Sequence, residues 1–538
     1  MAFFLSDGSL SGGWSLAAGL AVLLLSFPLE RLLRPASPLK GRPLAAHGAH
    51  LGILVLLFAM LLALVQRPLF AAGLELACFL LVVFVNNAKY QALREPFVFS
   101  DFGLFSQVFR FPRLYLPFLG PGGAVGLPLL VGLILYAGLT LEPSLPSRMG
   151  AAGFLFAVTA MAGGGLLLLR RAGCAGLEPN FHPAADLRSF GLVASLWLYW
   201  RAEVRDPGPA NESPFVGMVA PPKHRSAHSL PDIVAVQSES FFDARRLPVA
   251  VRPEVLARFD AVRGAALLSG RLRVAAWGAN TMRAEFAFLS GLASDRLGVH
   301  RFNPYRRFAR QPLPNLAQYL RGLGYRAICI HPHEKGFFAR DRVFEALGFD
   351  DFIDIQDFRD AERAGPYTAD AAVAAKILEL LATAGQPLFV FAITMENHGP
   401  LHLEQVLPDD VFRQFSFPPP PGCEDLTVYL RHLRNADRMI GDLASALGQR
   451  ERDGVLCFFG DHVPSMPKVY RALGFDDGRT DYFLWRTTPG PSAEAELDAS
   501  ELGLRLLEAA GLLDALSDAP TAAIPADRQA SRAAASGA

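Results

Sequence analysis

The sequence contains little cysteine and has no surplus of either charge. Its 538 residues include five cysteines, and none of them forms a CxxC pair. Closely spaced cysteines are typical of disulfide frameworks and of cysteine-based zinc sites, so neither is expected here. Lysine plus arginine and aspartate plus glutamate both number 51, so the net charge gives no indication of a nucleic-acid partner.

Long apolar runs are what the chain has in excess, and they lie in its first third. Hydrophobic residues make up 51% of the sequence. Each of five runs, with its flanks, reaches the roughly 20 residues needed to cross a bilayer. The first run begins near Trp14, and the others cover residues 50–65, 69–85, 124–141 and 151–169. They predict a helical membrane domain of about five spans. The first run lacks a small-residue cleavage site, so no removable signal peptide is predicted.

Composition divides the chain into four segments. Residues 1–172 are predicted to form the membrane domain and residues 173–230 a linker. The linker contains an amphipathic stretch at 190–203, which suits a membrane surface, and then a proline-rich extended stretch. Residues 231–515 are predicted to form a globular domain, and the alanine-rich tail at 516–538 is predicted to be disordered.

The globular domain alternates short apolar runs with helical patterns. The apolar runs of strand length are residues 232–237, 325–331, 387–395 and 455–460. The helical stretches between them include residues 313–324, 371–384 and 426–448. Alternation of this kind predicts an α/β domain with a mostly parallel central sheet.

Polar side chains follow each of the four predicted strands. They are Ser238, Glu239 and Ser240; His331, His333 and Glu334; Glu396, Asn397 and His398; and Asp461 and His462. In open α/β sheets the ligand site lies beyond the carboxyl ends of the strands. Carboxylates and imidazoles together in that place suit a divalent metal, although each motif alone is also typical of an ordinary turn.

Six motifs occur in a characteristic order along the chain. They are NNAKYQALREPFVFSDF at 86–102, QSESF around Glu239, GANTMRAEFAFLSGL at 278–292, HPHEKGFFARDRVFEALGFDDFID at 331–354, NHGP at 397–400 and GDH at 460–462. In these motifs the sequence resembles the alkaline phosphatase/sulfatase superfamily. Within it, the chain is most similar to the lipoteichoic acid synthase and phosphoglycerol transferase branch. The resemblance implies a sulfatase-like catalytic domain behind the membrane helices.

The resemblance also implies roles for individual residues. Thr281 aligns with the catalytic threonine, and the metal ligands beside it would be Glu239, Asp461 and His462. Substrate-binding positions would be Arg340, His333, Phe338 and His398. His398 would also be catalytic. The family has Asp in place of His333 and Trp in place of Phe338. A threonine hydroxyl needs activation, which one divalent ion supplies. Oxygen and nitrogen ligands suit Mn²⁺, with Zn²⁺ or Mg²⁺ as alternatives.

Several of these residues also have a purely structural interpretation. Thr281 could cap the helix that follows it, and Arg340 could be a surface charge. Glu285 is expected to make a structural hydrogen bond or salt bridge. The structural interpretation of Arg94 and Asp101 is that they simply anchor a loop at the membrane surface.

Together these features predict a membrane-bound, metal-dependent phosphoglycerol transferase. Phosphatidylglycerol would donate its head group to Thr281, and a hydroxyl of an envelope glycan or lipid would accept it from the phosphothreonine. Alternatives are phosphoethanolamine transfer, a phosphodiesterase with water as acceptor, and a non-catalytic envelope scaffold. Sulfatase activity is disfavoured because the segment NTMRA around Thr281 lacks the Cys and Pro of the sulfatase motif.

The predicted location is the bacterial inner membrane, with the catalytic domain on the periplasmic or extracellular side. Basic residues between Arg31 and Arg42 follow the first run, and Lys89 and Arg94 follow the third. The positive-inside rule would place these loops in the cytoplasm. Either the basic loops bind anionic head groups outside, or residues 190–200 form a short extra span.

Overall fold

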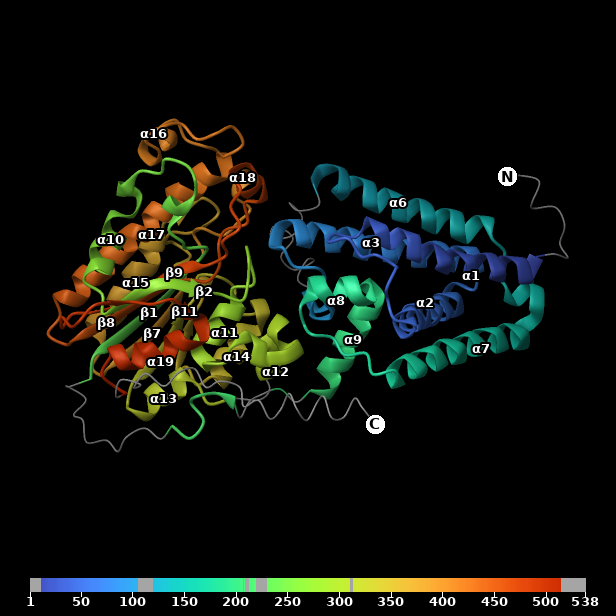
Figure 1. The fold of residues 1–538 in the computed structure, drawn as a ribbon, viewed down its shortest axis with the longest axis horizontal. Coiled ribbons are helices and arrows are strands. Elements are labelled where there is room, and N and C mark those ends of the chain that lie inside the picture. The colour runs from blue at the N-terminus through green and yellow to red at the C-terminus, as the bar shows by residue number, and fades with distance from the viewer. Residues whose placement is uncertain are drawn as a thin grey trace.

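Two regions make up the molecule, a group of long helices and an α/β domain (Figure 1). The computed structural model describes residues 11–104, 120–206, 208, 212–218, 230–309 and 313–513. The predicted disordered tail at 516–538 and most of the proline-rich stretch lie outside the described residues.

The long helices coincide with the apolar runs of the sequence. They are α1 (Ser11–Leu29), α2 (Leu44–Val65), α3 (Pro68–Leu93), α6 (Gly120–Leu141) and α7 (Pro146–Cys174). Among the described residues, α2, α3 and α7 are long and apolar enough to cross a membrane. A Cβ added to Gly52 of α2 would meet the Gly165 carbonyl of α7 at 3.0 Å, so glycine allows these two helices to approach closely. The total of about five spans stays a prediction.

Most of the amphipathic stretch at 190–203 lies in one helix, α9 (Leu192–Arg205). The helix α8 (Pro183–Phe190) precedes it, and the two meet at Gly191, where φ is +82°. Both helices lie between the two regions in Figure 1. In α9 the ring of Tyr199 is buried and stacks on Phe302 of the α/β domain at 5.3 Å. The apolar face of α9 therefore packs against protein.

The α/β domain contains a nine-stranded sheet that is mostly parallel, as predicted. Its path runs β10-β2-β9-β8-β1-β7-β3-β4, and β11 pairs with β2. The bounds are β1 (Asp232–Ser238), β2 (Leu268–Arg273), β3 (Arg326–Ile330), β4 (Asp351–Ile353), β7 (Leu388–Ile393), β8 (Gly454–Gly460), β9 (Thr480–Arg486), β10 (Ala493–Glu494) and β11 (Leu497–Asp498). Strand β9 runs antiparallel to β8 and β2. The four strands predicted from the sequence are confirmed, and they lie side by side in the centre.

Helices cover both faces of the sheet. In β1, Val234 and Val236 belong to one core, whereas Ile233 and Ala235 belong to the other. The first core includes residues of α10 (Ala257–Gly264), α15 (Asp370–Thr383) and α17 (Glu424–Gly448), and the second includes residues of α11 (Met282–Ser290), α13 (Leu316–Gly322), α14 (Arg340–Ala346) and α19 (Ala499–Ala509). Burial on both faces explains why the central strands are continuous apolar runs.

The domain also contains shorter elements. They include α12 (Pro304–Phe308), α16 (Asp410–Gln414), α18 (Pro467–Leu473) and the short strand pair β5 (Arg363–Ala364) and β6 (Tyr367–Thr368).

Candidate active site

Strands β1 and β8 bring three of the predicted metal ligands together. The two strands are parallel neighbours, and their register pairs Ser238 with Gly460. Glu239 is therefore next to Asp461 and His462 at the carboxyl ends of the strands. One ligand atom from each of the three lies within 4.8 Å of the other two, and all three side chains are buried.

Three atoms of this cluster lack a hydrogen-bond partner among the described residues. The His462 Nε2 atom lies 3.3 Å from Asp461 Oδ2 and 3.5 Å from Glu239 Oε1. Asp461 Oδ2, His462 Nε2 and Glu239 Oε2 are buried and have no hydrogen-bond partner among the described residues. Burial, and then the Asp461 carboxylate, raise the pKa of Glu239. Buried polar atoms are normally satisfied, so these unpaired oxygens and nitrogen fit a divalent cation.

Ser240 orients all three members of the cluster. Its hydroxyl donates to Glu239 Oε1 at 2.9 Å, and its backbone N–H donates to Asp461 Oδ1 at 2.8 Å. The Nδ1 atom of His462 lies 3.4 Å from the Ser240 hydroxyl and 3.1 Å from the Val463 carbonyl. A proton held on Nδ1 by these partners leaves the Nε2 lone pair for a metal. Sequence analysis placed Ser240 at the strand end but gave it no role.

Thr281 lies directly before α11, next to the strand end that carries Glu239. Its carbonyl accepts a hydrogen bond from Gln237 Nε2 at 3.3 Å, and Gln237 precedes Glu239 by two residues on β1. The side chain makes no capping hydrogen bond to α11 in the described structure, so the helix-cap interpretation lacks its contact. Asn280, directly before it, has φ of +69°. Such left-handed backbone conformations are uncommon and cluster at functional sites.

Arg340 is buried against Glu285 and is not a surface charge. It is 1% exposed, and its Nε donates to Glu285 Oε2 at 3.1 Å while Nη2 donates to Oε1. Tyr305 also donates to Glu285 Oε2, at 2.6 Å. The structural interpretation of Glu285 is confirmed. Glu285 binds Nε and Nη2 of the guanidinium, so these two atoms are not free to bind phosphate. Phosphate binding by Arg340 stays a prediction, and it would use Nη1.

The remaining predicted substrate residues surround Arg340. Its guanidinium lies 5.3 Å from the Phe338 ring. Burial, Arg340 and His398 lower the pKa of His333 to about 4. Burial also lowers the pKa of His398, whose Nδ1 lies 2.7 Å from the Gly399 carbonyl. Both imidazoles are therefore neutral at neutral pH.

The other strand-end residues do not join the cluster. Glu396 accepts hydrogen bonds from the Asp370 backbone at 2.7 Å and from Asn435 at 2.5 Å, and lies 2.9 Å from His432. His331 is buried, with Nδ1 3.2 Å from the Ile393 carbonyl. These contacts are structural.

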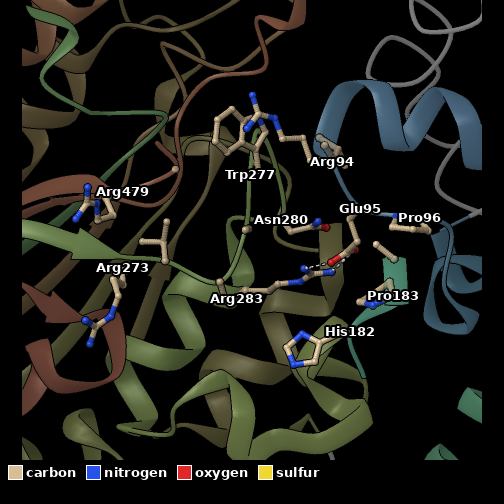
Figure 2. Close-up of a pocket in the computed structure, with 16 residues that line it drawn as sticks. Arg94, Glu95, Pro96, His182, Pro183, Arg273, Trp277, Asn280, Arg283 and Arg479 are labelled. Atoms are coloured by element: carbon tan, nitrogen blue, oxygen red, sulfur yellow. Dashed lines mark hydrogen bonds and ion pairs between the residues drawn. The ribbon is translucent and has the colours of Figure 1, made fainter. Parts of the chain in front are cut away.

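A loop after α3 contacts the segment that carries Thr281. Glu95 forms a two-point ion pair with Arg283 at 2.8 and 2.9 Å, and Arg94 lies 3.5 Å above the ring of Trp277. Although burial opposes it, the charges of Arg283 and Lys89 hold the pKa of Glu95 below its usual range. Figure 2 shows these pairs facing one another. Arg94 therefore does more than anchor a membrane-surface loop. Glu95 belongs to the predicted motif at 86–102 but had no role assigned from the sequence, and Trp277 was missed.

Asp101 keeps the anchoring role that was considered for it. It accepts hydrogen bonds from Lys89 Nζ at 2.6 Å and from the Val98 backbone at 2.8 Å. Lys89 also binds Glu95 at 2.8 Å. Asp101 thus fixes the loop that presents Glu95 to Arg283.

Comparison with known proteins gives consistent matches. A family model described as Sulfatase matches residues 231–512. The chain is 30% identical over 467 residues to the capsular polysaccharide biosynthesis protein RkpI of Rhizobium meliloti (strain 1021), covering 81% of this chain and 80% of that protein. It is 29% identical over 251 residues to a putative cyclic beta-1,2-glucan modification protein of the same strain, covering 46% and 38%.

Similar solved structures include two transferases. The Streptococcus pyogenes phosphoglycerol transferase GacH, in complex with sn-glycerol-1-phosphate, aligns with a TM-score of 0.46 and 22% identity, over 53% of this chain and 76% of that one. The integral membrane lipooligosaccharide phosphoethanolamine transferase A of Neisseria meningitidis aligns with a TM-score of 0.49 and 14% identity, over 88% and 96%.

Proposed function

The chain belongs to the sulfatase family, and from that premise we propose that it is a membrane-bound phosphoglycerol transferase. Phosphatidylglycerol would be the donor, and a hydroxyl of an envelope glycan or lipid the acceptor. The observation that carries the proposal is the buried Glu239, Asp461 and His462 cluster beside the Thr281 segment. The relative named for capsular polysaccharide biosynthesis supports a glycan acceptor.

The cluster would hold one divalent ion together with the Thr281 hydroxyl. Mn²⁺, Zn²⁺ and Mg²⁺ all accept such ligands. When bound, the ion would supply positive charge that lowers the pKa of the hydroxyl and of the neighbouring carboxyl groups. Ser240 would keep the Glu239 and Asp461 oxygens in place, since it donates to both.

The proposed reaction has two displacements at phosphorus. The Thr281 hydroxyl loses its proton as its oxygen forms a bond to the donor phosphorus, and the bond from phosphorus to the diacylglycerol oxygen breaks; that oxygen takes a proton. The oxygen of an acceptor hydroxyl then forms a bond to the same phosphorus as the hydroxyl loses its proton, and the Thr281 oxygen leaves and regains a proton. The phosphothreonine between the two steps carries the head group.

His398 suits the proton transfers of both steps. The Gly399 carbonyl lies 2.7 Å from Nδ1 and holds the proton there, so the neutral ring presents the lone pair of Nε2. This atom can take a proton from an attacking hydroxyl, and the charged ring can return it to a leaving oxygen. Arg340 Nη1, with Nε and Nη2 held by Glu285, would bind a phosphoryl oxygen.

The membrane helices would keep the catalytic domain beside its lipid donor. We place the membrane domain within residues 1–172 and the catalytic domain within residues 231–515, on the outer side of the inner membrane. The helices α2, α3 and α7 support membrane attachment by their length and apolar composition.

The test is a search for the head group on Thr281. The purified full chain is incubated with Mn²⁺ and phosphatidylglycerol, without acceptor, and the peptide holding GANTMR is analysed by mass spectrometry. We expect a phosphoglycerol adduct on this peptide, and none with Thr281→Ala. Thr383→Ala, at an exposed helical threonine, is the matched control and should keep the adduct. If phosphatidylethanolamine gives a phosphoethanolamine adduct and phosphatidylglycerol gives none, the donor is phosphatidylethanolamine and the phosphatidylglycerol assignment is wrong.

Activity separates the nucleophile from a structural threonine. Thr281→Ala should lower transfer by more than about a thousandfold, because the covalent route is lost. The free energy of unfolding should change by only about 0.5–2 kcal/mol, as for an ordinary substitution. A melting curve checks this. Near-normal transfer by folded Thr281→Ala protein would exclude the nucleophile.

A further inference from the structure

A cavity of about 520 Å³ lies between the helical region and the catalytic domain (Figure 2). One wall is formed by residues 93–96 after α3 and residues 182–184 at the start of α8. The opposite wall is formed by residues 273–280, with Arg283 and Arg479. Its volume is in the range of about 300–1,000 Å³ that is typical of small-molecule sites.

The lining of this cavity is positively charged. Four arginines, Arg94, Arg273, Arg283 and Arg479, face one carboxylate, Glu95, among the described lining residues. Arg283 is neutralised by its ion pair with Glu95. Arg94 instead lies over Trp277 and donates to two backbone carbonyls, so its positive charge is not cancelled by these contacts.

The left side of the cavity in Figure 2 holds the other two arginines. Arg273 and Arg479 both bind Glu496, at 3.1 and 2.7 Å, and Arg479 also binds Asp477, which Arg271 shares. The Arg273 side chain is 55% exposed, so its guanidinium can reorient toward a ligand. An anion in the cavity would meet cations on two sides.

The position of the cavity connects the membrane with Thr281. The apolar helix α3 ends at Leu93, which lines the cavity, so the cavity lies where a spanning α3 would leave the hydrocarbon. The opposite wall ends at Asn280, directly before Thr281. A lipid whose chains lie beside α3 could therefore place its head group next to the nucleophile segment.

We propose that this cavity binds the phosphodiester head group of an anionic phospholipid, with Arg94 and Arg273 as its cationic contacts. Guanidinium groups bind phosphate oxygens with charge-assisted hydrogen bonds, and basic pockets at membrane surfaces select anionic lipids. The assignment of this lipid as donor rests on the proposed function. The binding itself does not depend on Thr281 or on the metal.

Binding is measured without chemistry. The full chain carrying Thr281→Ala, in detergent micelles with chelator, is titrated with dioctanoyl phosphatidylglycerol by calorimetry. The test variant is Arg273→Gln, and the matched control is Arg271→Gln on the same strand. Arg271 is 44% exposed, pairs with Asp477, and is not among the described lining residues. Melting curves verify that both variants are folded.

We expect Arg273→Gln to weaken lipid binding by about tenfold, because one charge-assisted contact is lost. Arg271→Gln should leave the affinity unchanged. Equal affinities in the two variants would overturn the proposal. Equally tight binding of soluble sn-glycerol phosphate would show a free phosphate site and overturn the lipid assignment. If the lipid binds as expected but no adduct forms on Thr281 in the active chain, the transfer mechanism fails and the binding site stands.

Discussion

Two clusters of carboxylates and an imidazole lie at neighbouring strand ends, and they differ in how their polar atoms are paired. One follows β1 and β8 and contains Glu239, Asp461 and His462. The other follows β7 and contains Glu396 with His432 and Glu404. The residue types are the same, so composition alone cannot explain why only the first resembles a metal site.

The cluster after β7 supplies its own donors and its own cation. Glu396 accepts from Asp370, Asn435 and His432, and the His432 Nε2 lies 3.1 Å from Glu404. Against the effect of burial, hydrogen bonds with Glu396 and Glu404 raise the pKa of His432 to about 9. The imidazole is therefore protonated at neutral pH and balances the carboxylates.

The cluster after β1 and β8 leaves one atom of each member without a hydrogen-bond partner. The Nδ1 atom of His462 faces the Val463 carbonyl, while His462 Nε2, Glu239 Oε2 and Asp461 Oδ2 are unpaired among the described residues. The difference teaches that unpaired ligand atoms, and not the count of acidic side chains, distinguish a cation site from a structural network.

The largest expected effect is on metal content. Asp461→Asn combined with His462→Gln should abolish bound metal in the purified chain, whereas His432→Gln should keep it. Transfer should fall by more than about a thousandfold in the double variant, since a catalytic metal contributes several kcal/mol to transition-state stabilisation. Elemental analysis of the folded proteins checks this. Equal metal in the double variant and wild type would remove the distinction between the two clusters.

The sequence predicted the centre of the fold because its signals are local. Strands β1, β3, β7 and β8 are continuous apolar runs, and polar residues mark their carboxyl ends. Strand β2, which lies between β9 and the short strands β10 and β11, was missed because Arg271 and Arg273 interrupt its apolar pattern. A strand with charged, partly exposed positions lacks the continuous apolar run that marks the central strands.

The pairing of buried charges could not be predicted, because it depends on distant segments. Both Glu239 and Glu396 follow a buried strand, and only the position of His432 on α17 makes Glu396 structural. Arg340 likewise depends on Glu285, which lies 55 positions earlier in the chain. The roles of Thr281 and Glu239 came from the family resemblance and stay predictions until tested.

The second effect is on stability and its dependence on pH. His432→Gln should destabilise the folded chain by up to about 3 kcal/mol, because Glu396 and Glu404 lose a buried cation. The folded pKa of His432, about 9, is above its ordinary value of 6.5. Its contribution is therefore fully present below about pH 6.5 and is lost as the pH rises through about 9.

Denaturant unfolding from pH 6 to pH 10 measures this contribution. The difference between wild type and His432→Gln should shrink as the pH rises. His402→Gln, at an exposed histidine, is the matched control and should stay within about 0.5 kcal/mol of wild type. A difference that stays constant to pH 10 would show that His432 is not a cation in the folded protein.

The smallest expected effect is the change in the free energy of unfolding when one carboxylate is replaced by its amide. This change should have opposite signs in the two clusters. In metal-free protein, Asp461→Asn should stabilise the fold by about 1 kcal/mol, because it removes the buried carboxylate that, after burial, raises the pKa of Glu239. The asparagine oxygen can keep the hydrogen bonds from the Ser240 and His462 backbones that Asp461 Oδ1 accepts at 2.8 and 2.9 Å. Its amide can donate to His462 Nε2, which lies 3.3 Å from Oδ2 in the native protein.

Glu396→Gln is the matched substitution in the other cluster, and it should destabilise the fold. It removes a carboxylate that pairs with the His432 cation, so this buried cation keeps Glu404 as its remaining carboxylate partner. Urea unfolding of both variants in chelator compares them directly. With Mn²⁺ added, wild type should gain stability through binding and Asp461→Asn should gain less. If Asp461→Asn is as destabilising as Glu396→Gln in chelator, the first cluster is balanced without a metal, and the comparison on which its assignment depends is wrong.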